Sequence, residues 1–169
     1  MEPQPQNQKD TFHALRAELA DYLNKAYTHT LLADVAKDFP IKLANKKIKG
    51  VPYSPWALLE HIHITQHDML DFIRNPNYKE MEWPKDYWPK PGTKADRTMW
   101  DATLSGYLQD VVALTAIVLD TSIDIYKPIP RGTRGQNVFR EILQAIDHGS
   151  YHLGELVLLR RAMGAWGKK

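Results

Sequence analysis

The chain has 169 residues, of which 43% are hydrophobic and 25% are charged, a composition typical of a soluble globular protein with one domain. Its 22 basic and 20 acidic residues give a net charge of +2, and this small excess does not indicate a nucleic-acid partner. The absence of cysteine excludes disulfides, thiolate metal sites and a cysteine nucleophile.

The N-terminal residues 1–9 are polar and lack the apolar core of a signal peptide. We interpret them as a flexible leader, followed by a single domain over residues 10–166. No stretch of the chain approaches the roughly 20 apolar residues that cross a bilayer. These features predict a cytoplasmic protein with neither a membrane nor a nucleic-acid partner.

The first predicted helix covers residues 10–38. Its apolar residues recur at spacings of three and four, the period of an α-helix, at Phe12, Leu15, Leu19, Leu23 and Ala26. Pro40 marks the end of this helix, because proline cannot continue the backbone hydrogen bonds. Residues 40–53 then form a basic loop.

The second predicted helix has a strong start signal, with Ser54 at the N-cap and Pro55 at the first helical position, and it ends before Pro76. Residues 76–94 form a longer loop that is rich in proline and aromatic residues. Its large aromatic side chains line a pocket or a dimer interface, or they cap the end of the bundle: Trp83, Tyr87 and Trp88. The sequence does not decide whether this loop is a lid over a pocket, a dimer interface or a cap on the end of the bundle.

Two further helices are predicted over residues 95–122 and 136–164, with a loop at 124–135 between them. Gly164 fits the C-terminal cap of the last helix, because glycine adopts the left-handed conformation that often ends a helix. Four amphipathic helices of this length predict an all-α protein, a four-helix bundle with one shared core.

Three histidines in two of these helices form a candidate metal site. His148 and His152 are four residues apart, so both imidazoles leave the same side of the last helix. His61 lies at the border of the apolar stripe of the second helix. If these two helices pack together, three nitrogen ligands plus a water would form an open, catalytic type of metal site.

Other interpretations of the histidines stay open. His63 and His67 also have a four-residue spacing, but they fall on the more polar side of the second helix, which favours solvent. Gly149 stands where a metalloprotease HExxH motif has its glutamate, so a protease is disfavoured. The alternative to metal binding is that His61, His148 and His152 are hydrogen-bonded residues at the edge of a metal-free core. One carboxylate that orients a ligating imidazole is expected from a set of three: Glu155, Asp147 or Asp68.

Two segments resemble the DinB-like (DinB/YfiT) superfamily of metal-binding four-helix bundles, and the WPKDYWP tract between them is similar to one of its subfamilies. In SPWALLEHIHITQHDMLDFI the matching residues are Trp56, Leu59, His61, Gln66 and Asp68. In DHGSYHLGELVLLRRAMGAW they are His148, Tyr151, His152, Gly154 and Glu155. The resemblance implies an up-up-down-down bundle, homodimers and a metal triad of His61, His148 and His152.

Superfamily members include S-transferases and isomerases that use low-molecular-weight thiols. The resemblance therefore implies a metal-dependent enzyme, a thiol S-transferase or a hydrolase, with a small thiol as a possible cosubstrate. Three imidazoles favour a divalent transition metal, with zinc or nickel as the leading ions. The alternative is a non-catalytic bundle, stabilised by metal or free of it, that acts as a binding or stress-related module.

Overall fold

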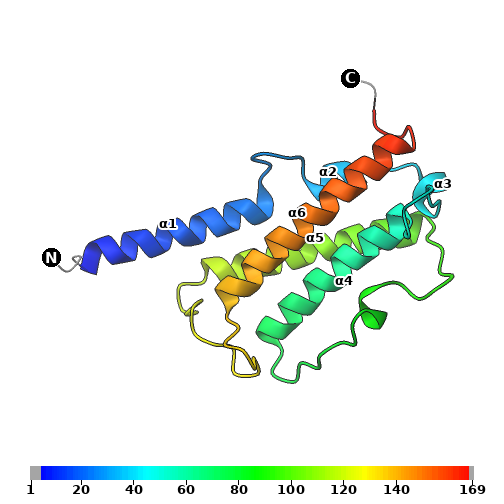
Figure 1. Cartoon of the computed structure of the whole chain (residues 1–169). Helices are drawn as coiled ribbons and strands as arrows, with labels where there is room; N and C mark the ends of the chain where they lie inside the picture. The colour runs from blue at the N-terminus through cyan, green and yellow to red at the C-terminus, as the bar shows by residue number, and fades with distance from the viewer. Residues whose placement is uncertain (1–4, 168–169) are drawn as a thin grey trace.

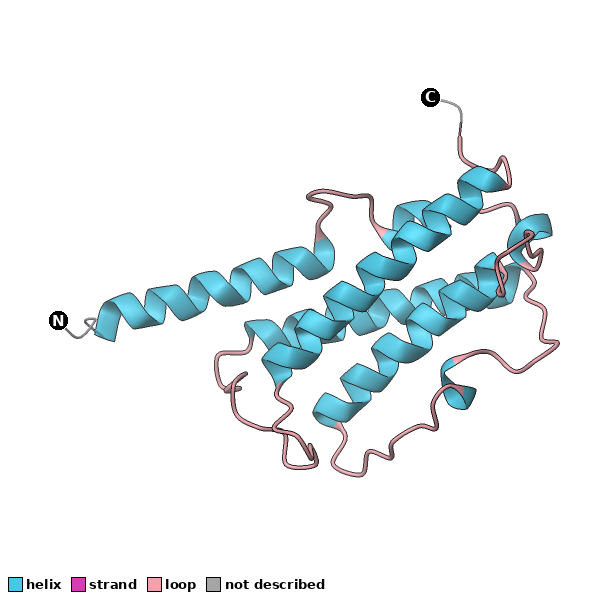
Figure 2. Cartoon of the chain, viewed as in Figure 1, coloured by secondary structure: helices cyan, strands magenta, loops and turns pink. Residues whose placement is uncertain are grey.

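The structure of the protein is a computed structural model that describes residues 5–167, and the regular structure in that range is helical (Figure 2). This confirms the all-α class. The longer helices are α1 (Pro5–Asn24), α4 (Pro55–Arg74), α5 (Arg97–Leu119) and α6 (Val138–Ala162). The shorter ones are α2 (Leu32–Ala36), α3 (Ile41–Ala44) and the 3₁₀ helix η1 (Lys85–Tyr87).

The first predicted helix is wrong in its extent, because two helices with a break between them occupy residues 10–38. The side-chain amide of Asn24 donates to the Ala20 carbonyl at 2.8 Å and to Thr115 Oγ1 at 2.7 Å, and so ends α1. The following segment contains Thr28 and Thr30, whose branched side chains disfavour a helix. At the other end α1 already begins at Pro5, and residues 1–4 of the expected leader lie outside the described residues.

The predicted ends of α4 and α6 are confirmed. Ser54 Oγ accepts a hydrogen bond from the Ala57 N–H at 3.2 Å, and Pro55 occupies the first helical position. Gly164 has a positive φ of 68°, and its N–H donates to the Arg161 carbonyl at 2.9 Å. The next N–H, of Ala165, donates back to the Arg160 carbonyl, which completes a Schellman motif.

Cross-helix contacts show how the four long helices run. Hydrogen bonds pair Glu60 of α4 with Thr103 of α5, and Gln66 with Tyr107, so these two helices are parallel. Figure 1 shows α1 and α6 running the opposite way. The order along the chain is therefore up-down-down-up, which differs from the up-up-down-down order implied by the resemblance. The long connection between α4 and α5 runs back along the length of α4, and this allows the two helices to be parallel (Figure 1).

The hydrophobic core has two buried clusters, one toward each end of α4. The first joins the start of α4 to α2, α5 and α6, and in it Phe39 stacks on Trp100 with ring centroids 4.6 Å apart. The second joins the end of α4 to α1, α5 and α6 and includes Leu70, Leu114 and Ile142. Residues 40–53 are thus only partly the expected loop, because α3 lies within them and adds Ala44 to the first cluster.

Among the described residues, α5 is the one helix that is long and apolar enough, by length and composition, to cross a membrane. The sequence-based expectation that no stretch approaches such a length is therefore wrong for α5. Core helices of soluble proteins pass the same test, and α5 packs against both α1 and α4. Its composition alone does not assign a membrane.

Candidate metal centre

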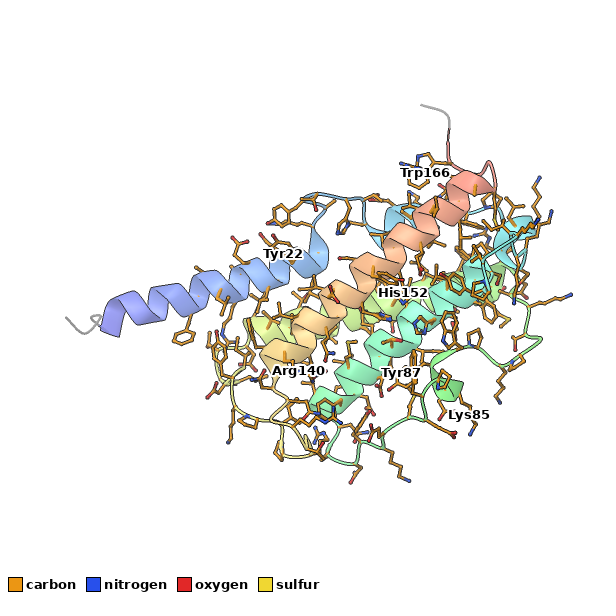
Figure 3. All side chains as sticks on the ribbon, in the orientation of Figure 1. Tyr22, Lys85, Tyr87, Arg140, His152 and Trp166 are labelled. Atoms are coloured by element: carbon orange, nitrogen blue, oxygen red, sulfur yellow. The ribbon has the colours of Figure 1, made fainter. Side chains whose placement is uncertain are left out.

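Antiparallel packing of α4 and α6 brings the three predicted histidines together. His61, only 2% exposed, projects from α4 toward His148 and His152, which lie one turn apart on α6. The Nε2 atoms of His61 and His148 are 3.2 Å apart, and one ring nitrogen from each of the three lies within 4.8 Å of the others. Figure 3 shows His152 between α6 and α4. The expected juxtaposition of the two helices is confirmed.

Hydrogen bonds fix the tautomers of two of these imidazoles. His61 Nδ1 lies 2.7 Å from the Tyr87 carbonyl oxygen, and His152 Nδ1 lies 2.6 Å from Glu155 Oε2. Both partners only accept, so each Nδ1 must carry the proton and donate it. Each Nε2 therefore presents a lone pair, which is the arrangement that metal-ligating histidines have in proteins. Of the three carboxylates suggested by the sequence, Glu155 makes this contact with the triad.

Burial disfavours the charged form of two of the three imidazoles, His61 and His148. The pKa of His148 is lowered to about 4, mainly by burial and then by its neighbours His152 and His61. Burial also lowers the pKa of His61. Neutral imidazoles are the form that binds metal, so at neutral pH these two ligands need not lose a proton first.

The spacing fits a tetrahedral metal. Two nitrogens that are each about 2.0–2.1 Å from zinc at a tetrahedral angle lie roughly 3.3 Å apart. The 3.2 Å between the Nε2 atoms of His61 and His148 matches this value. In the metal-free protein, these two Nε2 atoms can form a hydrogen bond only if His148 Nε2 carries the proton, because His61 has its proton on Nδ1.

Aromatic residues cover one side of the site. Trp88 stacks on the His61 ring with centroids 4.0 Å apart and planes 2° apart, and Tyr53 stacks on Trp88 in turn, with centroids 5.4 Å apart. Trp83, 68% exposed, lies further out, with its ring centroid 6.5 Å from that of His61. The loop that follows α4 therefore lies beside the triad, and its backbone and side chains both contact His61.

Asp68 attaches this loop to α4. Its two carboxylate oxygens accept hydrogen bonds from the hydroxyls of Tyr78 at 2.9 Å and Tyr87 at 2.8 Å. Burial and the Asp68 carboxylate raise the pKa of both tyrosines. Tyr87 therefore connects Asp68 to the triad, because its hydroxyl donates to Asp68 and its carbonyl accepts from His61. The sequence does not predict the hydrogen bond between His61 and Tyr87, because the acceptor is a backbone carbonyl, which every residue type has.

A polar cavity of about 420 Å³ lies next to Tyr87, between the end of α4 and the start of α6. Its walls include Arg140, Glu141 and Gln144. Gln144 precedes His148 by one helical turn, but none of the three triad histidines lines the cavity. Burial raises the pKa of Glu141, while the adjacent Arg140 acts in the opposite direction.

The prediction that His63 and His67 face solvent is wrong for His63 and only half right for His67. The His63 side chain is 24% exposed and lies against α5, whereas the His67 side chain is 52% exposed. Both approach the carboxylate of Asp110 on α5. The polar face of α4 therefore packs against α5. The spacing of polar and apolar residues along α4 does not predict this contact.

No match to this chain is found among protein-family models, curated proteins or solved structures. The DinB-like resemblance therefore rests on its two sequence segments alone. What the triad can do must follow from the arrangement of its side chains.

Proposed function

We propose that the protein is a metal-dependent enzyme in which His61, His148 and His152 bind one divalent transition metal, zinc or nickel, within a DinB-like four-helix bundle. One observation carries the proposal. Two of the three imidazoles donate their Nδ1–H to acceptor-only partners, which leaves a lone pair on Nε2 of each, and one ring nitrogen from each of the three histidines lies within 4.8 Å of the others.

A metal held by three neutral imidazoles keeps its full charge and at least one open position, and it lowers the pKa of a water or thiol bound there. The chain has no cysteine, so a thiol would come from a cosubstrate. Thiol S-transfer is the reaction we favour, in line with the resemblance, and hydrolysis by an activated water is the other enzyme class.

The surroundings of the triad have separate tasks in this proposal. Glu155 and the Tyr87 carbonyl hold the imidazoles in the binding orientation. Trp88 excludes water from one side of His61, which strengthens electrostatic interactions at the site. The cavity beside Gln144 has the volume for a small substrate, about 420 Å³, and its polar walls favour a polar substrate over an apolar one.

A non-catalytic, metal-stabilised bundle is the second candidate, and the burial of His61 behind Trp88 favours it. In that case the metal would be closed off from ligands. The two candidates therefore differ in one property. The enzyme needs a coordination position at which a bound water can be replaced by another ligand, and the metal-stabilised bundle has no such position.

We further propose a cytoplasmic homodimer. Several large apolar side chains on α5 are exposed and would suit an interface with a second copy of the chain: Leu108, Val112 and Leu119. These residues lie away from the triad, so dimer formation would leave access to the metal unchanged.

Cobalt-substituted protein tests the enzyme proposal. Adding a small thiol such as 2-mercaptoethanol should shift the visible absorption of the cobalt, because a thiolate enters the coordination shell. The His148→Ala/His152→Ala variant is the matched control, because any shift that it retains comes from cobalt outside the triad, and the shift of the unaltered protein should exceed it. A spectrum of the unaltered protein that does not respond to thiol, chloride or azide would mean a closed site and would favour the metal-stabilised bundle.

A further inference from the structure

A second group of potential metal ligands lies between α4 and α5, apart from the triad. It consists of His63 and His67 on α4 and Asp110 on α5. His63 is about 200° around the helix from His61, at 100° per residue, so the two imidazoles leave nearly opposite faces of α4. The proposed function does not use these three side chains.

The three side chains converge closely. His67 Nδ1 lies 3.1 Å and 3.0 Å from the two carboxylate oxygens of Asp110, and His63 Nε2 lies 3.6 Å from Oδ2. One ligand atom from each residue lies within 4.8 Å of the others. These separations bracket the roughly 3.3 Å expected between two ligands of a tetrahedral zinc ion.

The helix opposite His63 is shaped for its ring. Gly106 lies inside α5, and a Cβ at that position would stand 2.6 Å from both Nε2 and Cε1 of His63. Glycine in a helix interior is less favourable than alanine, so its presence at this position calls for a packing reason. The absence of a side chain at Gly106 therefore allows the imidazole to lie over the backbone of α5 with Nε2 toward Asp110.

The electrostatics favour a cation. Asp110 is buried, with 9% of its side chain exposed, and in the described part of the chain its ion-pairing partners are the two imidazoles rather than lysine or arginine. Buried carboxylates are normally paired with a cation or coordinate a metal. An adjoining cavity of about 200 Å³ is lined by the carboxylates of Glu60, Asp68 and Asp71 and by Lys79, so acidic groups outnumber basic ones there and would draw a cation toward the site.

We propose that His63, His67 and Asp110 bind a second divalent transition-metal ion, which links α4 to α5. Two imidazoles and one carboxylate are a ligand set that zinc and iron(II) accept with positions left open. His67 would bind through Nδ1 and keep its proton on Nε2. The site shares no ligand with the triad, and the half-exposed His67 leaves it open to water.

Equilibrium dialysis against zinc, with the full chain, tests this site separately from the triad. In the His148→Ala/His152→Ala background we expect about one equivalent of zinc to remain, bound through the two imidazoles and one carboxylate. Adding His63→Ala or Asp110→Asn should weaken this binding at least about tenfold. Adding His13→Ala, at an exposed histidine of α1, is the control and should leave it unchanged.

Gly106→Ala provides a test that removes no ligand. Alanine favours the helix but collides with the His63 ring, so zinc affinity in the same background should fall about tenfold while circular dichroism stays helical. Background zinc in the His148→Ala/His152→Ala protein would overturn the proposal and leave a histidine–aspartate hydrogen-bond network. Zinc that is retained equally after His63→Ala, Asp110→Asn and Gly106→Ala would also overturn it. Neither outcome bears on the triad, which this background lacks.

Discussion

The two histidine clusters lie on opposite sides of α4, and they differ in what surrounds the imidazoles. At the triad, all three candidate ligands are imidazoles, and a carboxylate and a carbonyl contact two of them from outside. At the second cluster the carboxylate of Asp110 is itself a candidate ligand, and His67 is half exposed. The first arrangement would leave a bound metal strongly electrophilic, which suits catalysis where one coordination position stays open. The second would partly neutralise the metal, which suits a cross-link between the two helices.

Removing a triad ligand should have the largest effect. His61→Ala is expected to weaken zinc binding at the triad by about 100-fold or more, because a tridentate site becomes bidentate. Competition with a chromophoric chelator measures this affinity. The same variant should leave zinc binding by His63, His67 and Asp110 unchanged, and His13→Ala should change neither. An equal loss at both clusters would show that they are one coupled site.

Acid should destabilise the metal-free protein through His148. The unfolded chain protonates this residue near pH 6.5, but the folded protein resists until about pH 4, so the unfolded state binds more protons between these values. The free energy of unfolding should therefore fall by about 1–3 kcal/mol as the pH drops from 6.5 to 4, and level off below. Urea unfolding of chelator-treated protein across this range measures the effect.

The His148→Gln variant is the control for this pH dependence. It keeps a polar side chain at the same place but has no titratable ring, so its stability should change less over the same interval. Identical pH profiles for the two proteins would contradict the burial of a neutral His148.

Glu155 should have an intermediate effect. Glu155→Gln removes the charge that holds His152 in its tautomer, and zinc affinity at the triad should fall about 10- to 100-fold. Asp147→Asn is the matched control, since Asp147 is exposed on the same helix and should have no effect. Similar losses in both variants would point to general charge on α6 rather than to a specific contact.

Asp68→Asn should have the smallest effect. Asparagine offers one neutral acceptor oxygen in place of two charged ones, so one tyrosine hydroxyl loses its acceptor and the free energy of unfolding should drop by about 1–2 kcal/mol. Hydrogen exchange of residues 78–88 should rise at the same time, because the loop is less tightly attached to α4. Asp101→Asn, at an exposed residue of α5, serves as the comparison. A stability change with unaltered exchange in the loop would contradict the anchoring role of Asp68.

The sequence predicts those features that depend on local chemistry. Ser54 with Pro55 locates the start of α4, Gly164 locates the end of α6, and the four-residue spacing of His148 and His152 places both on one side. A helix start, a helix end and a helical face are each decided within a few residues of chain, and for that reason they are predictable.

Features that depend on a distant partner could not be predicted. His63 lies on a polar face of α4, and only the packing of α5 turns that face into a contact with Asp110. The hydrogen bond from His61 to Tyr87 uses a backbone carbonyl, which any residue type would supply. The directions of the helices depend on how the long connections run, and residue periodicity carries no information about them.

Metal content tests the central claim most directly. Untagged protein and the His148→Ala/His152→Ala variant, both dialysed with zinc and then freed of unbound metal, would be compared by plasma mass spectrometry. We predict about two equivalents in the unaltered protein and about one in the variant, because the variant loses the triad and keeps the second cluster. Equal metal content in the two proteins would contradict a metal centre at His61, His148 and His152.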